Sequence, residues 1–303
     1  MPCCYDDQPS MVIVYSPRCL EYAALGHPES PERVRSVMAQ LHKEFHTWVE
    51  PMPCADENIL RVHTRELLDA VRLGAFTDPD TPHFPEIFET AKLSAGAAML
   101  AAEHALAGRP AFSLMRPPGH HAERSRVMGF CYFNNIAIAV AKTFHSSPNV
   151  QRVAILDFDC HHGNGTEDIF QGDERVLFVS LHQSPCYPGT GIASEGNCLN
   201  YLLAPGTGPA QFLAALDEAL GRIRHFKPGL LAISAGFDAY KNDPITHMGL
   251  ELETFHEIGR RIADFTRPSP SVPALPCFAV LEGGYSRELA KCVDAFIGGW
   301  ERH

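Results

Sequence analysis

Short apolar runs alternate along the chain with longer stretches in which apolar residues recur at helical spacing. The short runs predict six strands, at Val12–Ser16, Ala111–Met115, Val153–Asp159, Val176–His182, Leu230–Ala235 and Phe278–Glu282. The longer stretches predict a helix that begins at Pro31 and helices at Phe88–Leu106, Asn134–Phe144, Ala210–Phe226, Glu253–Phe265 and Ser286–Trp300. Continuously apolar strands separated by helices are typical of a parallel sheet covered on both faces.

A single domain accounts for this order of elements. The proline-rich stretches Thr77–Pro85 and Arg267–Pro276 bring no change in composition, so we interpret them as surface loops and not as linkers. The first ten residues contain no apolar run and predict a flexible segment at 1–10, with the folded domain at 11–303. With 45% apolar residues, the 303-residue chain can bury a sizeable core.

Charge and cysteine content narrow the classes of partner and compartment. The 25 basic and 36 acidic residues leave a net charge of −11, which argues against nucleic acid and suits a cationic partner such as a lysine-rich peptide or a polyamine. The ten cysteines form no CxxC pair and predict reduced thiols in a cytoplasmic protein. No secretory signal is evident, and no stretch reaches the roughly 18 apolar residues of a membrane span.

A candidate metal cluster follows two of the apolar runs. Side chains alternate in a strand, so an extended chain through Asp157, Asp159 and His161 places these three on one side. Asp238 ends another apolar run and is expected at the same sheet edge. Asp159, His161 and Asp238 therefore predict one catalytic divalent ion with room for water, as in zinc sites, although this ligand set also suits iron, cobalt or manganese. The alternative is that the acids cap loops or pair with arginines.

Two consecutive histidines follow a rigid turn. His120 and His121 come directly after Arg116-Pro117-Pro118-Gly119, at the end of a predicted strand. Near a metal site, such a pair suggests a general acid and base. Each ring needs a partner that sets its tautomer, and Asp157 and Asn164 are the candidates.

A tyrosine and two aromatic residues complete the set of candidates. Gly283 and Gly284 let the chain turn tightly before Tyr285, whose phenol can donate a hydrogen bond to a developing oxyanion. Phe130 and Tyr187 are candidates for the walls of a narrow channel for an aliphatic chain. Ordinary core packing explains these two aromatic residues nearly as well.

Taken together, these motifs resemble the zinc-dependent histone deacetylase family, and the match covers nearly the whole chain. At position 164 this sequence has asparagine, where some relatives have aspartate. In this respect it resembles the class II-like branch of the family and its prokaryotic amidohydrolases. The matching motifs, in order, are GHPESPERV, RVHT, RPPGHHA, GFCYFNN, DFDCHHGNGT, YPGTG, SAGFDAYKNDP and EGGY.

The resemblance implies an arginase-like α/β fold with a mostly parallel, eight-stranded sheet and a deacetylase catalytic domain at 11–303. It implies zinc at the three predicted ligands, His121 as general base and acid, and His120 as its electrostatic companion. Tyr285 would polarise the carbonyl of an acetylated or similarly acylated lysine. The tunnel for the acyl-lysine would be lined by Gly129, Phe130, Tyr187, Ile245 and Gly283.

Two further sites are implied by the resemblance alone. Arg33 matches an arginine near a pocket for acetate release. Potassium would bind behind the zinc, largely through backbone carbonyls, at Asp157, Asp159, His161, Ser180 and Leu181.

Three alternative functions stay open. An acetylpolyamine amidohydrolase of the same fold is disfavoured by Ile245, since polyamine-specific relatives can carry an acidic residue at the tunnel mouth. An arginase-like hydrolase would need two manganese ions and more acidic ligands. A catalytically inactive acyl-lysine binding module is disfavoured by the presence of Tyr285 and both histidines.

Overall fold

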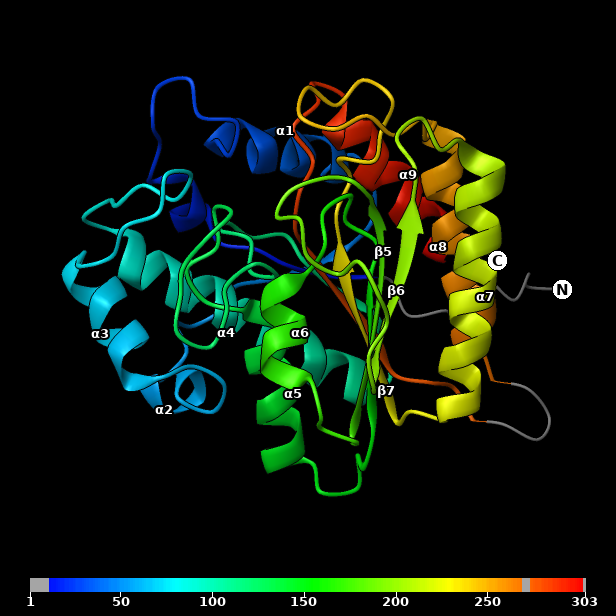
Figure 1. Ribbon diagram of the computed structural model, residues 1–303, viewed down its shortest axis with the longest axis horizontal. Coiled ribbons are helices and arrows are strands. Elements are labelled where there is room, and N and C mark those ends of the chain that lie inside the picture. The colour runs from blue at the N-terminus through cyan, green and yellow to red at the C-terminus, as the bar shows by residue number, and fades with distance from the viewer. Residues whose placement is uncertain (1–10, 269–272, 302–303) are drawn as a thin grey trace, which may run out of the picture.

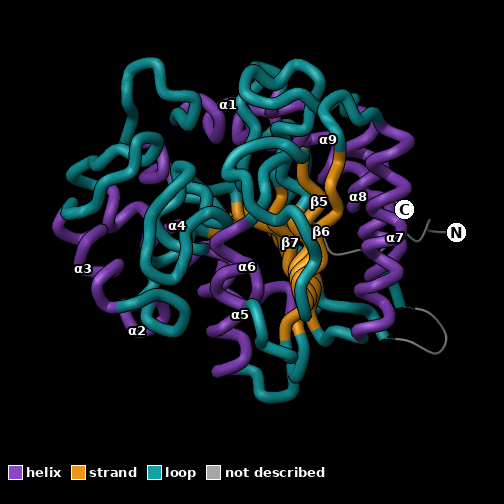
Figure 2. Tube along the Cα trace, in the orientation of Figure 1, coloured by secondary structure: helices purple, strands orange, loops and turns teal. Residues whose placement is uncertain are grey.

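A twisted sheet of parallel strands runs through the centre of the molecule (Figure 2). The computed structural model describes residues 11–268 and 273–301, and within them eight strands form one sheet in the order β2-β1-β3-β8-β7-β4-β5-β6. Every neighbouring pair of strands is parallel. The strands are β1 Val12–Val14, β2 Thr47–Val49, β3 Ala111–Ser113, β4 Val153–Asp157, β5 Val176–Gln183, β6 Cys198–Leu203, β7 Leu230–Ala235 and β8 Cys277–Leu281.

Helices cover both faces of the sheet (Figure 1). On one face α4 packs against β1, β3 and β8, α5 against β7 and α6 against β5, while α2 and α3 lie outside them. On the other face α7 contacts β5 and α8, and α9 packs between α8 and α1. The helices are the short 3-10 helix η1 Pro17–Leu20, α1 Pro31–Leu41, α2 Asp56–Ile59, α3 Arg65–Leu73, α4 Ile87–Leu106, α5 Asn135–Ser146, α6 Asn164–Phe170, α7 Pro209–Phe226, α8 Leu252–Thr266 and α9 Leu289–Glu301.

The sequence explains where several helices begin. Prolines occupy the first turn of α1 and α7, where their missing N–H would lack an intrahelical partner in any case. The Thr64 side chain accepts a hydrogen bond from Leu67 N at the start of α3, and Asn134 accepts one from Ala137 N at the start of α5. The cap at Asn134 sets the point at which the loop that carries both site histidines becomes helical.

The predicted α/β fold with a parallel, eight-stranded sheet is confirmed. Several predicted boundaries of strands and helices were wrong, and several elements were missed. The strand Leu230–Ala235 is observed as predicted, whereas the strand predicted to reach Asp159 ends at Asp157, where the chain bends. The short elements β2, β6, η1, α2, α3 and α6 were not predicted. Residues 1–10, predicted as a flexible segment, and 269–272 of the second predicted loop lie outside the described residues.

The four central strands decide which side chains can meet. In the sheet β3 neighbours β8, β8 neighbours β7, and β7 neighbours β4. Parallel strands end at a common edge, so the segments that follow these four strands are brought together there. These segments carry both histidines of the RPPGHH turn, the EGGY motif, Asp238, and the DFDCHH motif.

Candidate active site

Asp159, His161 and Asp238 form a buried cluster at the carboxyl edge of the sheet. His161 Nδ1 lies 3.1 Å from Asp159 Oδ1 and 2.8 Å from Asp238 Oδ2. The backbone holds both carboxylates, since Gly283 N donates to Asp159 Oδ2 (2.7 Å) and Cys160 N donates to Asp238 Oδ1 (2.8 Å). Asp238 Oδ2 is buried, and among the described residues it accepts no hydrogen bond of good geometry, although His161 Nδ1 lies close to it. Two carboxylates and an imidazole that converge around an unsatisfied oxygen fit a divalent cation.

The prediction that strand alternation brings these side chains together was wrong in part. Strand alternation cannot place Asp159 and His161, because both follow the end of β4, in a bend. Two glycines leave the room that the cluster needs. A Cβ at Gly236 would lie 2.1 Å from Asp159 Oδ2, and a Cβ at Gly283 would lie 2.5 Å from Asp159 Oδ2 and from Asp238 Oδ2. The bend and the glycine backbones, and not the pleat of a strand, bring the three ligand candidates together.

The two histidines lie side by side with different partners. Their ring centroids are 4.0 Å apart, and both residues are buried. His120 Nδ1 lies 3.0 Å from Asp157 Oδ2, and His121 Nδ1 lies 2.7 Å from Asn164 Oδ1. Asn164 Nδ2 donates to Glu123 Oε1 (2.8 Å), which orients the amide so that its oxygen faces His121. His121 Nδ1 must therefore carry the proton, and its Nε2 is left as the basic nitrogen.

The different partners separate the pKa values of the two rings. Burial alone would lower the pKa of His120, but the carboxylates of Asp159, Asp157 and Glu282 outweigh burial and raise this pKa to about 10. Burial and the charges of His120 and His161 hold the pKa of His121 well below its usual value. These opposite directions favour the imidazolium form of His120 and the neutral form of His121.

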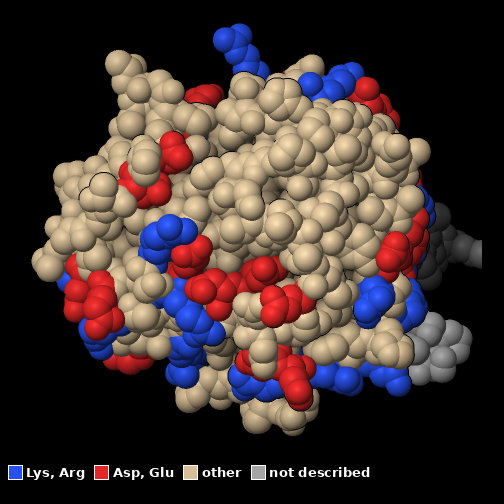
Figure 3. Space-filling model, in the orientation of Figure 1, with Lys and Arg blue, Asp and Glu red and all other residues tan. Residues whose placement is uncertain are grey.

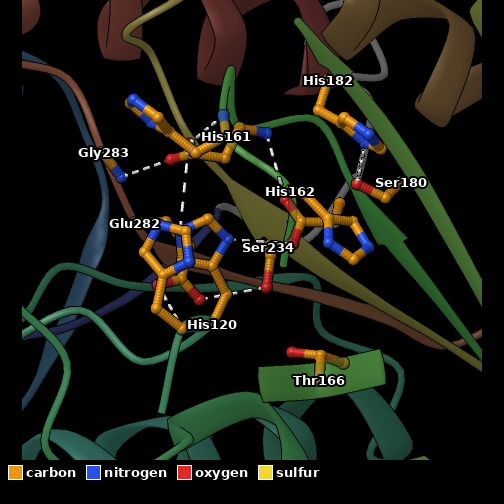
Figure 4. Close-up of polar contacts among 12 residues, drawn as sticks. His120, His161, His162, Thr166, Ser180, His182, Ser234, Glu282 and Gly283 are labelled. Atoms are coloured by element: carbon orange, nitrogen blue, oxygen red, sulfur yellow. Dashed lines mark hydrogen bonds and ion pairs between the residues drawn. The ribbon is translucent and has the colours of Figure 1, made fainter. Parts of the chain in front are cut away.

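Glu282 fixes the turn that carries both histidines. Its Oε2 accepts hydrogen bonds from Gly119 N (2.7 Å) and His120 N (3.2 Å), and its Oε1 accepts one from Ser234 Oγ (3.0 Å). Figure 4 shows Glu282 beside His120 and Ser234, together with the hydrogen bond that Gly283 N donates to Asp159. One fully buried carboxylate thus connects the histidine turn with the ends of β7 and β8.

Tyr285 is held from both its backbone and its ring. Its N–H donates to Asp243 Oδ2 (2.7 Å), while Asp243 Oδ1 accepts a hydrogen bond from Ile245 N (3.1 Å). The Tyr285 ring packs edge-on against Phe130, with centroids 5.8 Å apart, and lies 4.7 Å from the Arg33 guanidinium carbon. Burial raises the pKa of Tyr285 well above its usual value, so its hydroxyl keeps the proton that it would donate.

A pocket of about 250 Å³ opens above these residues. All five residues predicted for the tunnel line it, and so do His120, His121, His161 and Tyr285. Gly129 is required where it stands, because its φ is +56° and a Cβ would lie 2.4 Å from His121 Cδ2. Sequence reasoning missed Pro28, Asp80 and Pro118, which also line the pocket. The residues predicted for the tunnel are Gly129, Phe130, Tyr187, Ile245 and Gly283.

The residues predicted for potassium fall into two groups: Asp159 and His161 belong to the metal cluster itself, and the other three lie on the adjacent strands β4 and β5. Asp157 on β4 is paired in register with Ser180 on β5, and Leu181 follows directly; all three are buried. Ser180 Oγ lies 2.9 Å from His182 Nδ1. Figure 4 shows this contact between Ser180 and His182. Arg33 donates from Nε to Gly284 O (2.7 Å) and from Nη2 to Glu282 O, immediately before Tyr285.

Comparison with known proteins shows what this arrangement belongs to. Residues 27–299 match the family model of the histone deacetylase domain. The chain belongs to the histone deacetylase family. It is 41% identical to a probable deacetylase of Methanothermobacter thermautotrophicus, over 95% of this chain and 90% of the relative. It is 37% identical to a histone deacetylase-like amidohydrolase of Pseudomonas aeruginosa, over 87% of this chain and 74% of the relative.

A solved structure extends the comparison. The acetylpolyamine aminohydrolase of Burkholderia pseudomallei superposes with a TM-score of 0.87 at 28% identity, over 97% of this chain and 99% of that one. The family membership therefore makes this protein an enzyme of the deacetylase and amidohydrolase class.

The surface and the helices add two general observations. On the face drawn in Figure 3, acidic and basic side chains mix and gather mainly along the lower part, so this face offers no basic patch of the kind that nucleic acid needs. Across residues 11–268 and 273–301, no helix is long and apolar enough to cross a membrane.

Proposed function

We propose that this deacetylase removes acetyl, or related acyl, groups from lysine side chains of proteins or peptides, with one zinc ion held by Asp159, His161 and Asp238. The observation that supports the proposal is that the histidine pair, Tyr285 and His161 line one pocket, and that His161 belongs to the buried cluster of the three ligand candidates. A pocket walled by Phe130 and Tyr187 suits the methylene chain of an acylated lysine. At the pocket Asp80 adds a carboxylate that suits a cationic or N–H-bearing part of the substrate.

The ion, when bound, supplies Lewis-acid polarisation of the amide carbonyl and makes a water more acidic. His121 accepts a proton from the attacking water through Nε2, since Asn164 occupies its Nδ1. The Tyr285 hydroxyl donates a hydrogen bond to the carbonyl oxygen as negative charge develops on it. The His121 imidazolium then protonates the departing amine. The products are a carboxylic acid and an amine, which become a carboxylate and an ammonium group when the acid passes its proton to the amine. His120, already cationic beside Asp157, stabilises the negative charge and does not exchange its proton.

We also propose potassium behind the zinc and a cytoplasmic location. Potassium is supported by the burial of Asp157, Ser180 and Leu181 on adjacent strands, and activity measured with potassium replaced by choline tests it. The cytoplasmic location is supported by the cysteines, since all eight within the described residues are free. Fractionation of the source cells tests the location.

A paired assay tests the proposed substrate class. Purified protein is incubated with acetyl-lysine peptides and, separately, with mono-acetylated diamines, and the released acetate is measured. We expect kcat/KM to be higher for the peptides. Activity on neither substrate class would contradict the proposal, provided that the protein carries its ion.

The second candidate is an acetylpolyamine amidohydrolase. It is supported by the structural similarity to the acetylpolyamine aminohydrolase and by Asp80, a carboxylate that could pair with a second ammonium group. Against it stands Ile245, an apolar residue at the pocket wall where an acidic residue would favour a polyamine. A higher kcat/KM for the acetylated diamines, lost in Asp80→Asn, would establish this candidate instead.

A further inference from the structure

We propose a second divalent-cation site, formed by Glu44, His46 and Glu301, at the end of the sheet opposite the active site. Each residue offers one ligand atom, and these atoms all lie within 4.8 Å of one another. His46 directly precedes β2, and Glu301 is the last residue of α9. Strands β1 and β2 begin here, whereas the catalytic residues follow the carboxyl ends of the strands. The proposal is independent of the substrate of the active site.

The buried ring of His46 is the observation that indicates a cation at this site. Its side chain is only 1% exposed, yet neither ring nitrogen has a hydrogen-bond partner in the part of the chain that the structure describes. Nδ1 lies 3.3 Å from Glu301 Oε1, without the geometry of a hydrogen bond. Buried ring nitrogens are normally satisfied, because leaving them unpaired costs their hydration. A cation held jointly with the two carboxylates would satisfy the ring.

Glu301 is held in place for this role. Its Oε1 accepts a hydrogen bond from Met11 N (2.8 Å), and Met11 O in turn accepts one from Thr47 N (3.0 Å). The carboxylate that faces His46 is therefore connected to the residue that precedes β1 and, through it, to the first residue of the edge strand β2. Such contacts orient a ligand before the ion arrives, as the partners of metal ligands commonly do.

The donor chemistry identifies the class of ion and its effect. Two carboxylates and one imidazole repeat the donor set of the active-site cluster, so zinc, manganese and cobalt all suit the site. An ion there would cross-link the end of α9 to the chain that enters β2 and would act on stability, not on turnover. The competing arrangement is an imidazolium at His46 paired with the carboxylates and no ion.

Metal counting with matched variants separates these arrangements. Tag-free wild-type protein, His46→Gln, Glu301→Gln and the control His145→Gln, which changes an exposed histidine at the end of α5, are dialysed against the same buffered zinc solution. We expect two zinc ions per chain in the wild type and the control, and one in each site variant with deacetylase activity retained. Asp238→Ala should also keep one ion but lose activity.

Two results would overturn the proposal. One zinc ion per chain in the wild type would leave His46 as an ion-paired imidazolium, and this count does not depend on whether any variant folds. Two ions in both His46→Gln and Glu301→Gln would place the second ion elsewhere. A zinc-dependent rise in the melting temperature of the wild type, absent from Glu301→Gln, is the expected independent sign of the site.

Discussion

The difference between the two site histidines can be tested by moving one charge. In Asn164→Asp the neutral amide oxygen 2.7 Å from His121 Nδ1 becomes part of a carboxylate. His121 would then have the same kind of partner that His120 already has in Asp157, at 3.0 Å. An adjacent carboxylate stabilises the imidazolium, so the pKa of His121 should rise.

The sign and size of the change in pKa follow from the proposed role of His121 as a base. A base must be unprotonated, so kcat/KM should be lost as pH falls through its pKa. In the wild type this pKa is held well below its usual value, so the acidic limb of the pH profile should lie below about 6.5. A neighbouring opposite charge shifts a pKa by about 1–3 units, so Asn164→Asp should move the limb upward by that amount.

Glu123 affects the new carboxylate. Its Oε1 lies 2.8 Å from Asn164 Nδ2, so in Asn164→Asp two carboxylates would face each other. Their repulsion would favour a protonated acid and reduce the shift. The double variant Asn164→Asp with Glu123→Gln removes this repulsion and should show the larger upward shift, with Glu123→Gln alone as its control.

The assay is kcat/KM against pH on an acetyl-lysine peptide, with metal content measured at each pH so that loss of the ion is not mistaken for protonation. His121→Ala should lower kcat by about 10²–10⁴-fold, the usual contribution of a general base, whereas His120→Ala should retain measurable activity. An acidic limb that does not move in either variant with Asn164→Asp would refute the reasoning. A greater loss in His120→Ala than in His121→Ala would refute it as well.

Four other changes test separate parts of the structure. Tyr285→Phe should lower kcat by about 10²-fold or more with metal content unchanged, as expected for one oxyanion donor, and unchanged turnover would make this tyrosine a packing residue. Asp243→Asn should lower kcat more than it changes KM, because the amide keeps only one acceptor oxygen for the N–H groups of Tyr285 and Ile245; equal kcat would refute this. Removal of the ion with a chelator should abolish activity, and added zinc should restore it. Phe296→Ala should lower the free energy of unfolding by about 3–5 kcal/mol in urea titrations, since Phe296 is buried among aromatic rings, and a loss below about 1 kcal/mol would contradict this.

The predictable part of the fold is its centre. Strands such as β7 are buried on both faces, so they appear in the sequence as continuous apolar runs with clear ends. The edge strands lack this signal. In β6 only the first and last residues, Cys198 and Leu203, are buried, and the three residues of β2 are all partly exposed. An edge strand is defined by its partner across the sheet, which local composition does not record.

The residues of the candidate site could also be predicted only where the signal is local in the sequence. Residues in dense local motifs, such as His120 and His161, could be predicted from the sequence. Each lies in a short segment with several polar residues that directly follows an apolar strand. Glu282 and Asp243 were quoted within motifs but given no role, because their partners are distant in sequence. Glu282 accepts a hydrogen bond from Gly119 N, which lies 163 residues away in the sequence. Asp243 accepts one from Tyr285 N, 42 residues away. The one available signal for Glu282 was a carboxylate at the end of an apolar strand, directly before the glycines.

If both proposed sites hold an ion, the position of each ion, and not the number of ions, would distinguish this chain from an arginase-like enzyme. Paired catalytic metals lie about 3.5–4 Å apart and share bridging ligands. Among residues 11–268 and 273–301, the groupings that could hold an ion are Asp159 with His161 and Asp238, and Glu44 with His46 and Glu301. These two groupings lie at opposite ends of the parallel strands, so their ions cannot be bridged. Two manganese ions per chain without magnetic coupling in electron paramagnetic resonance would therefore agree with a mononuclear deacetylase, whereas a coupled pair would require a dinuclear active site.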